Sequence, residues 1–302
     1  MIKLKAWLNA ARLRTLPLSI SGILVGAAIA SWQGFTNLSI LLLALLTTVG
    51  LQVTSNFAND YGDGVKGTDN SDRIGPQRAL QSGLLTAIQL KRGIYISIVI
   101  NIFLVILLVL VSFGTDNLDY IILFLVLGGF AIWAAIKYTV GKSAYGYYGL
   151  GDVFVFVFFG LVSVLGTHFL FVKSFYPLAL LPAISIGLLS VGVLNLNNMR
   201  DHRSDQAVGK NTVVVKMGYA KAKKYHYLIL VTAFLCLFYF LFTTNGSHLR
   251  YVSLIGFLPV FIHMRKVSVT ENEANLDPEL KKLALSTFMT ALLFFISYYY
   301  FL

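Results

Sequence analysis

Two polar clusters in the sequence have the residue types and the spacing to hold a divalent cation. They share the pattern Asn-x-x-x-Asp with a further aspartate three or four residues on, and they comprise Asn56, Asp60 and Asp63, and Asn197, Asp201 and Asp205. Such spacing places the side chains of each cluster on one face of a helix. Proteins typically bind Mg²⁺ through one or two carboxylates together with substrate phosphates. The sequence therefore predicts that the two clusters face each other and bind Mg²⁺ with a diphosphate.

Basic residues interleave with the clusters and could neutralise the remaining phosphate oxygens. They are Arg73, Arg78, Arg203 and Lys210. Metal-assisted departure of diphosphate from an allylic carbon would leave a carbocation, which needs an electron-rich acceptor. The simpler interpretation is that the aspartates and arginines form helix caps and surface ion pairs. Two matched clusters favour the metal and diphosphate site, and their likeness hints at an internal repeat.

The clusters lie at the ends of apolar segments in a chain suited to a lipid bilayer. Of its residues 57% are hydrophobic and 12% charged, and the mean hydropathy is +0.75, which leaves too little polar surface for a water-soluble protein of this size. Nine runs are long enough to cross the hydrocarbon, which takes roughly 20 residues. They cover residues 16–33, 38–58, 92–113, 119–137, 150–171, 176–196, 225–243, 249–264 and 283–301. We expect an all-α protein of nine transmembrane helices around a central cavity, in a single domain over residues 1–302.

The distribution of basic residues predicts the orientation. With the N-terminus inside, only Lys173 and Arg250 of the 24 Lys and Arg residues fall in outside connections, which agrees with the positive-inside rule. The net charge of +11 is then a signal of topology and of anionic lipid rather than of nucleic-acid binding. The inside connections at 59–91 and 197–224 are far longer than two helices need. We expect the Asp-rich loops on the cytoplasmic face of a bacterial inner membrane.

Other segments are interpreted more simply. The acidic residues within 265–282 have no ordered spacing, which predicts a solvated surface connection. The N-terminal segment MIKLKAWLNAARLRTLP has no cleavage site and predicts a retained amphipathic lead-in. Cys236 lies in an apolar run and predicts packing alone. The histidines without ligand spacing are expected to be structural or interfacial, and they are His168, His226, His248 and His263.

Four stretches resemble the intramembrane prenyltransferase (UbiA) superfamily. They are ARLRTLPLSISGILVG, NFANDYGDGVKGTDNSDRIGPQRALQSG, YTVGKSAYGYYGLGDVFVFVFFG and NNMRDHRSDQAVGKNTVVVKMG, spread over roughly the first two thirds of the chain. Many members of the superfamily carry a further aspartate where this chain has Gly67, with Asp69 two residues later. The Gly67-Thr68-Asp69 form looks like the branch that prenylates 1,4-dihydroxy-2-naphthoate, and favours it over the 4-hydroxybenzoate branch.

The resemblance implies roles for individual residues. Mg²⁺ and diphosphate ligation would fall on Asp60, Asp63, Asp201 and Asp205, with Asn56 and Asn197. Further diphosphate contacts would come from Tyr138 and Lys142, with Lys137 as a rival to Lys142, and from Arg14 in the first span.

Asp152 and a set of tyrosines are open to two interpretations each. Asp152 begins the fifth span, where an intramembrane carboxylate suggests acceptor-side or proton-handling work, but it could equally cap a helix. Tyr145, Tyr147 and Tyr148 could stabilise positive charge through cation–π contacts or form an interfacial aromatic belt.

The reaction implied by the resemblance is transfer of a polyprenyl chain from polyprenyl diphosphate to 1,4-dihydroxy-2-naphthoate. Diphosphate and CO₂ would be lost and demethylmenaquinone formed, as in menaquinone biosynthesis. Other aromatic acceptors, such as 4-hydroxybenzoate, homogentisate or haem, stay open. A cation transporter is the alternative from another class, but it would place charges near mid-span, whereas nearly all charges here lie at one membrane face.

Overall fold

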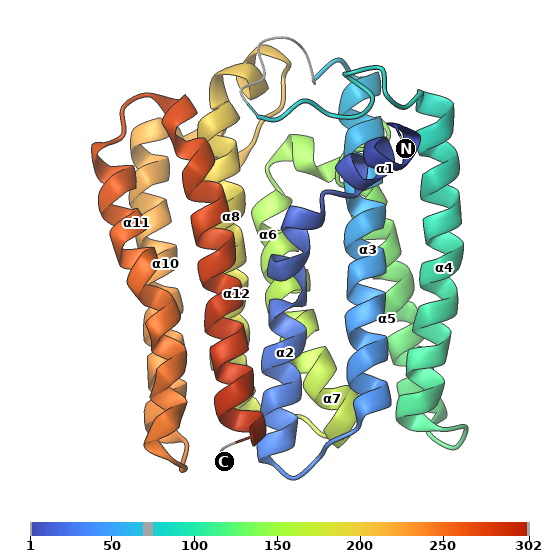
Figure 1. Cartoon of the computed structure of the whole chain (residues 1–302), viewed down its shortest axis with the longest axis vertical. Helices are drawn as coiled ribbons and strands as arrows, with labels where there is room; N and C mark the ends of the chain where they lie inside the picture. Colours follow the sequence, from blue (N-terminus) through green and yellow to red (C-terminus); the bar gives the residue numbers. More distant parts are fainter. Residues whose placement is uncertain (1, 69–74, 301–302) are drawn as a thin grey trace.

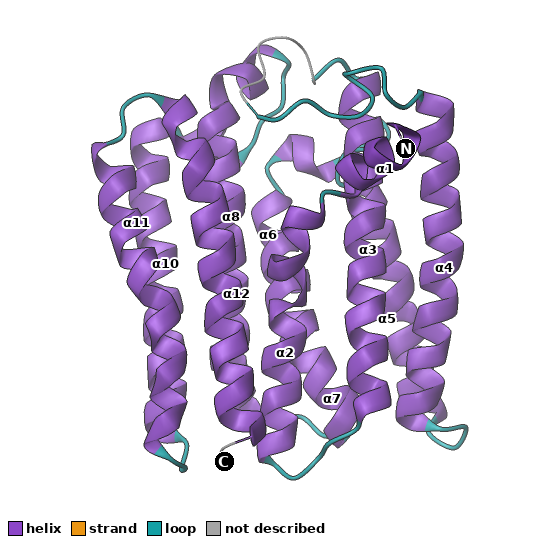
Figure 2. Ribbon diagram, in the orientation of Figure 1, coloured by secondary structure: helices purple, strands orange, loops and turns teal. Residues whose placement is uncertain are grey.

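The computed structural model describes residues 2–68 and 75–300, and the regular structure within these ranges is entirely helical (Figure 2). Nine helical stretches among the described residues are long and apolar enough to cross a membrane. The prediction of an all-α fold with nine spans is therefore confirmed. The first helix of the chain lies at one end of the bundle, and the last helix finishes at the other end (Figure 1).

The spans follow one another in the order of the chain. They are α2 (Leu16–Trp32), α3 (Leu38–Val65), α4 (Ala87–Phe113), α5 (Leu118–Lys137), α6–η3–α7 (Gly151–Val155, Phe156–Gly166, Thr167–Val172), η4–α8 (Pro177–Ala179, Leu180–Ala207), α10 (Tyr219–Thr243), η5–α11 (His248–Phe257, Leu258–Val269) and α12 (Asp277–Tyr300). A short helix α1 (Ile2–Ala11) precedes α2 through the turn η1 (Leu13–Thr15). The small elements η2 (Tyr145–Tyr148), α9 (Val213–Met217) and η6 (Glu273–Leu276) lie in connections.

Helices α3 and α8 continue well past the expected ends of their apolar runs. The sequence placed these ends at residues 58 and 196, and those boundaries are wrong, because the helices run on to Val65 and Ala207. Backbone hydrogen bonding continues through the polar residues until a glycine with positive φ stops each helix, Gly67 in one case and Gly209 in the other, both at φ 72°. The aspartates therefore lie on the last turns of two rigid helices.

Both helix ends have the same hydrogen-bond pattern, known as a Schellman motif. After α3, the Thr68 N–H donates to the Asp63 carbonyl at 3.0 Å. After α8, the Lys210 N–H donates to the Asp205 carbonyl at 2.8 Å. Each motif thus joins the last aspartate of its cluster to the residue that follows the glycine.

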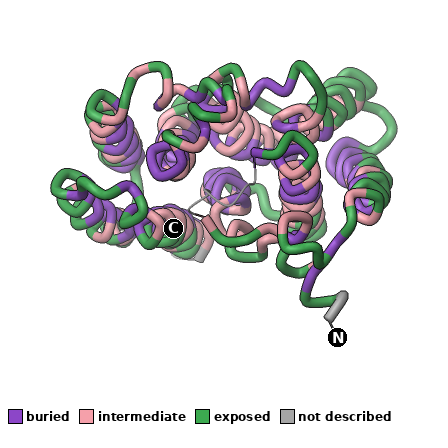
Figure 3. Tube along the Cα trace, turned by 90° about the horizontal axis from the view of Figure 1, so that it is seen from above, coloured by how far each residue is buried: buried purple, intermediate pink, exposed green. Residues whose placement is uncertain are grey.

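Buried positions lie where the helices face one another, and exposed positions lie on the outside of the bundle (Figure 3). Helix α8 lies at the centre of the main core, where Ile186 and Leu189 are fully buried with Leu230 of α10 and Phe294 of α12. Exposed large side chains such as Phe103 and Phe242 lie on the outer surface. An apolar outer surface of this kind suits contact with lipid rather than water.

The connection between α11 and α12 is ordered, so its interpretation as a solvated surface segment is wrong. Glu273 of η6 accepts from Arg203 Nε at 3.0 Å, and Asp277 pairs with Arg200. Glu279 is buried and contacts His263 Nδ1 at 2.8 Å, and His263 in turn contacts His226 at 2.9 Å. Acidic side chains without helical spacing along the sequence acquire fixed partners because η6 and the first turn of α12 pack against α8 and α11.

Candidate active site

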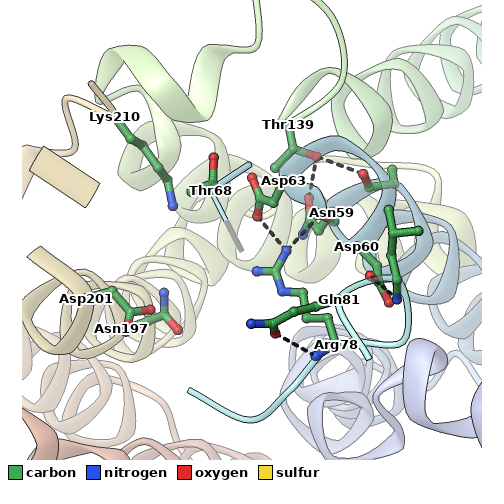
Figure 4. A network of polar contacts seen from close by, with 12 residues as sticks. Asn59, Asp60, Asp63, Thr68, Arg78, Gln81, Thr139, Asn197, Asp201 and Lys210 are labelled. Carbon is green, nitrogen blue, oxygen red and sulfur yellow. Dashed lines mark hydrogen bonds and ion pairs between the residues drawn. The ribbon is translucent and has the colours of Figure 1, made fainter. Parts of the chain in front are cut away.

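Asp63 of the first aspartate cluster and all three residues of the second line one small polar pocket at the same end of α3 and α8. The pocket has a volume of about 20 Å³ and is lined by polar side chains, which are Asp63, Thr68, Arg78, Asn197, Asp201, Ser204, Asp205 and Lys210. Asn197, Asp201 and Lys210 lie on one side of it, and Asp63 and Arg78 lie on the other (Figure 4). The tertiary structure thus brings together two segments that are far apart in the chain.

Asp63 is the centre of the α3 side of the pocket. One carboxylate oxygen accepts from Arg78 Nη1 at 2.6 Å, and the other accepts from the Tyr147 hydroxyl at 2.8 Å. Thr68 lies 2.6 Å from that hydroxyl, and since the Tyr147 proton goes to Asp63, Thr68 donates. The ammonium of Lys66 sits 3.8 Å from the centre of the Tyr147 ring. Tyr147 therefore binds two residues that line the pocket, and the cations over its ring are two lysines of this chain, Lys66 and, at 5.8 Å, Lys210.

Asp60, which is 1% exposed, anchors the loop that carries Arg78. Its two oxygens accept from the backbone N–H groups of Ala79 and Leu80 at 3.1 and 3.2 Å. Arg78 Nη1 also donates to the Asn59 carbonyl at 2.8 Å. A carboxylate that accepts two backbone N–H bonds is strongly held in place. Asp60 therefore fixes the position from which Arg78 reaches Asp63.

On the α8 side, each aspartate is paired with a basic residue. Both oxygens of Asp201 accept from Arg200, from Nε at 2.8 Å and from Nη2 at 2.6 Å. Lys210 Nζ lies 3.2 Å from Asp205 Oδ1, while the buried Oδ2 has no hydrogen-bond partner among the described residues. Burial disfavours the Lys210 ammonium, but Asp205 and Asp63 outweigh that effect and raise the pKa of Lys210 above its ordinary value. Lys210 therefore stays cationic.

A much larger cavity of about 810 Å³ opens beside the polar pocket. The two share the lining residues Asp63, Arg78, Asn197 and Lys210. From there the cavity runs between the helices to apolar side chains near their far ends, among them Val109, Phe124 and Leu170. Phenylalanines of the π-helical stretch η3 also line it, and π-helical segments often occur at functional sites. The space combines a charged mouth with a long apolar interior.

Two further predicted residues line this cavity. Tyr138 follows directly after α5, and burial raises the pKa of its phenol to about 12, so the hydroxyl stays protonated. Arg14 lies in η1 at the N-terminal side of the cavity, and Arg12 lies beside it. Sequence reasoning named Arg14 but not Arg12.

Several predicted site residues have other partners. The Asn56 amide donates to the Ala11 carbonyl at 2.8 Å and to Thr15 at 3.1 Å, which ties the N-terminal segment to α3. Lys142 is exposed on the surface. Arg73 lies outside the described residues. The structure thus gives Asn56 a structural contact, and Lys210 rather than Lys142 is the lysine at the pocket.

Asp152 and Arg203 also point elsewhere. Asp152, buried in the first turn of α6, accepts from the Tyr225 hydroxyl of α10 at 3.0 Å. The Arg203 side chain is 81% exposed and binds Glu273. These contacts join α6 to α10, and α8 to η6, outside the polar pocket.

Besides Arg12, sequence reasoning missed Arg200 and Asp277, which the structure places at the site. Arg200 binds Asp201 and lines the large cavity, and its partner Asp277 lines the same cavity from α12. The only local signal was the position of Arg200 directly before Asp201. No local sequence signal pointed to Asp277, because its partner lies on another helix.

The donor set fits a Mg²⁺ ion that shares its ligands with a substrate. No three His, Cys, Asp or Glu side chains in the described ranges stand close enough to hold a metal ion by themselves. Asp63, Asp201 and Asp205 nevertheless line one pocket, and Asp205 keeps a buried oxygen without a partner from the described part of the chain. Mg²⁺ needs only one or two carboxylates when phosphate oxygens complete its shell.

Comparison with known proteins identifies the family. The model of the UbiA prenyltransferase family matches residues 19–299. The chain belongs to this family. It is 42% identical to the 1,4-dihydroxy-2-naphthoate octaprenyltransferase of Escherichia coli strain K12, over 96% of this chain and 94% of that protein. It is 35% identical to the 1,4-dihydroxy-2-naphthoate octaprenyltransferase of Mycobacterium tuberculosis, over 77% of each.

Solved structures of UbiA proteins share the fold. A UbiA homologue from Aeropyrum pernix K1, solved in its apo form, superimposes with a TM-score of 0.68 at 14% identity, covering 91% of this chain and 97% of that one. A UbiA homologue from Archaeoglobus fulgidus, bound to DMAPP and Mg²⁺, superimposes with a TM-score of 0.60 at 14% identity, covering 96% and 99%. At these identities the likeness establishes the helical architecture alone.

Proposed function

We propose that this UbiA protein transfers a polyprenyl group from polyprenyl diphosphate to 1,4-dihydroxy-2-naphthoate. The observation that carries the reaction class is the polar pocket lined by both aspartate clusters beside a long apolar cavity. The charged side chains that the pocket shares with the large cavity would bind the diphosphate, and the cavity would hold the polyprenyl tail. The acceptor rests on the relatives that share 42% and 35% identity with this chain.

The residues of the pocket divide the binding work between them. Asp63, Asp201 and Asp205 would hold Mg²⁺, which when bound neutralises charge on the departing diphosphate. Arg78 and Lys210 would bind phosphate oxygens by charge-assisted hydrogen bonds. Asp60 holds the Arg78 loop in place through its two backbone contacts. The apolar cavity keeps water from the allylic carbon.

The chemistry balances as a substitution at the acceptor ring. The allylic C–O bond breaks and diphosphate leaves with the electron pair. The ring carbon that bears the carboxylate attacks the allylic carbon, because the ring hydroxyls make it electron-rich. CO₂ then leaves and returns its electron pair to the ring. The product is the reduced form of demethylmenaquinone.

An assay with isolated membranes tests this function. The membranes are incubated with radiolabelled polyprenyl diphosphate, Mg²⁺ and carboxyl-labelled 1,4-dihydroxy-2-naphthoate, with 4-hydroxybenzoate and homogentisate in parallel. We expect a prenylated naphthoquinol and labelled CO₂ only with the naphthoate. Transfer to 4-hydroxybenzoate alone would show that the acceptor is not the naphthoate. Mg²⁺ flux into vesicles without diphosphate release would show that the protein is a cation transporter and not a transferase.

We also propose that the polar pocket faces the cytoplasm. The connections at its end of the bundle carry most of the basic residues, and the opposite end carries Lys173 and Arg250. The enzyme would then draw the charged head of its donor from the cytoplasm and the tail from the bilayer.

A further inference from the structure

Arg200 connects the second aspartate cluster to the beginning of α12. Its guanidinium is 3% exposed and donates to both oxygens of Asp201 and to Asn197 Oδ1 at 3.0 Å. Its remaining terminal nitrogen, Nη1, pairs with Asp277, the first residue of α12. Two carboxylates therefore share one buried arginine.

The two carboxylates differ in what lies around them. Asp201 faces the polar pocket, whereas Asp277 is 43% exposed and faces the large cavity beside Arg200. A cation that binds Asp201 competes with Arg200 for the negative charge of that carboxylate, because each of its oxygens accepts a hydrogen bond from the guanidinium. A buried guanidinium that loses its counter-charge is strongly unfavourable. Asp277 supplies Arg200 with a second counter-charge, which stays in place when Asp201 binds a cation.

We propose that Asp277 is a positioning residue for the second aspartate cluster. It retains Arg200 on the α12 side, so that Asp201 can exchange its arginine for Mg²⁺ and the donor diphosphate. This inference rests on the proposed function, because it assigns Mg²⁺ and diphosphate to that pocket. Asp277 acts through Arg200 and is not itself a ligand.

Asp277 could instead have a purely structural role, in which its ion pair only holds α12 against α8. The chain offers a comparable ion pair that separates this role from the proposed one. Glu273 of η6 binds Arg203 and lies 3.4 Å from His202 Nδ1, both on α8. Glu273 and its two partners lie outside the cavity lining. Removing either acid breaks an ion pair between the α11–α12 connection and α8, but only Asp277 shares its arginine with a pocket aspartate.

The test compares Asp277→Asn with wild type and with Glu273→Gln in purified full-length protein. Mg²⁺ is titrated in the prenyl-transfer assay, and Mn²⁺ binding is measured separately by electron paramagnetic resonance in the presence of a non-cleavable thiolo-diphosphate analogue of the donor. We expect Asp277→Asn to raise two quantities by about tenfold or more: the Mg²⁺ concentration for half-maximal activity and the dissociation constant of Mn²⁺. Tenfold corresponds to about 1.4 kcal/mol. Saturating Mg²⁺ should restore most of kcat, and Glu273→Gln should keep both quantities within about twofold of wild type.

The outcomes separate this inference from the proposed function. If wild type binds Mn²⁺ but prenylates none of the acceptors, the proposed function fails, and the Mn²⁺ constants still decide the role of Asp277. If Asp277→Asn binds Mn²⁺ as wild type does, or if Glu273→Gln weakens it equally, the inference is wrong. Should Asp277→Asn fail to fold, Asp277→Glu can be used, because it keeps the counter-charge of Arg200. Its dissociation constant for Mn²⁺ should stay within about threefold of wild type. A tenfold increase would show that the Asp277 carboxylate is itself a metal ligand.

Discussion

Asp63 and Asp205 occupy equivalent positions at the ends of two helices. The carbonyl of each accepts the closing hydrogen bond of a Schellman motif, from Thr68 in one case and from Lys210 in the other. The side chains of all four residues line the same polar pocket. The glycine before each donor, at φ 72°, therefore sets the point at which an aspartate and a pocket residue meet. The internal repeat stays a prediction, and this shared geometry supports it.

The two glycines give a first prediction. No atom of the described residues lies within 4 Å of a Cβ added at Gly67 or Gly209, so alanine there should cost the strain of the left-handed conformation, about 1–2 kcal/mol. We expect Gly67→Ala and Gly209→Ala to lower the melting temperature in detergent and to raise KM for the donor. Gly129→Ala, in α5 with ordinary helical φ and no atom of the described residues near the added Cβ, is the control and should neither lower the melting temperature nor raise KM, because alanine favours a helix over glycine.

The lysine at the pocket gives a second prediction, because the sequence named both Lys142 and Lys210 as diphosphate contacts. Lys210 contacts Asp205 and lines both cavities, whereas Lys142 is exposed. Loss of a charge-assisted hydrogen bond costs about 1.5–3 kcal/mol, so Lys210→Gln should raise the donor KM by about 10- to 100-fold. Lys142→Gln should change it by less than about twofold. A larger increase of the donor KM for Lys142→Gln than for Lys210→Gln in a steady-state assay would show that Lys142 binds the diphosphate.

The aspartates of α3 give a third prediction. Asp63 faces the pocket, while Asp60 holds the backbone of Ala79 and Leu80. We expect Asp63→Asn to lower kcat by about 100-fold, as removal of an electrostatic stabiliser does, with a higher Mg²⁺ requirement. Asp60→Asn should instead lower the melting temperature and raise the donor KM while the Mg²⁺ requirement stays near that of wild type. Equal shifts of the Mg²⁺ requirement in both variants would place Asp60 among the metal ligands.

Asp152 gives a fourth prediction, because the sequence left two roles open. Its carboxylate binds Tyr225 on α10. Tyr225→Phe leaves that buried carboxylate without its donor, at a cost of about 1–3 kcal/mol, so the melting temperature should fall while kcat changes little. A fall in kcat at an unchanged melting temperature would instead show that the pair serves the reaction.

The orientation gives a fifth prediction. Lys142 lies at the pocket end of the bundle and Asp116 at the opposite end, and both are exposed. In a Cys236→Ala background, a membrane-impermeant maleimide added to intact cells should label Asp116→Cys but not Lys142→Cys. Inverted membrane vesicles should show the opposite pattern. Labelling of Lys142→Cys in intact cells would place the pocket outside.

The sequence by itself determined the features that depend on local pattern. Nine spans follow from hydropathy, because a helix must bring about 20 apolar residues into the hydrocarbon. The grouping of Asp60 with Asp63, and of Asp201 with Asp205, follows from helical periodicity, because these residues share a face within a turn or two. The pattern also placed the clusters near the ends of helices. It misjudged where these two helices stop, because hydropathy falls before the backbone hydrogen bonds end.

Tertiary structure decided which residue each of these side chains binds. Arg200 could have remained with Asp201 alone, and only the packing of α12 against α8 brings Asp277 to its other side. Lys210 reaches the pocket because Gly209 turns the chain back toward Asp205, while Lys142 follows a path to the surface. Local sequence sets hydropathy and helical phase. The partner of a charged side chain depends on where distant helices and connections come to lie, and that is a property of the whole bundle.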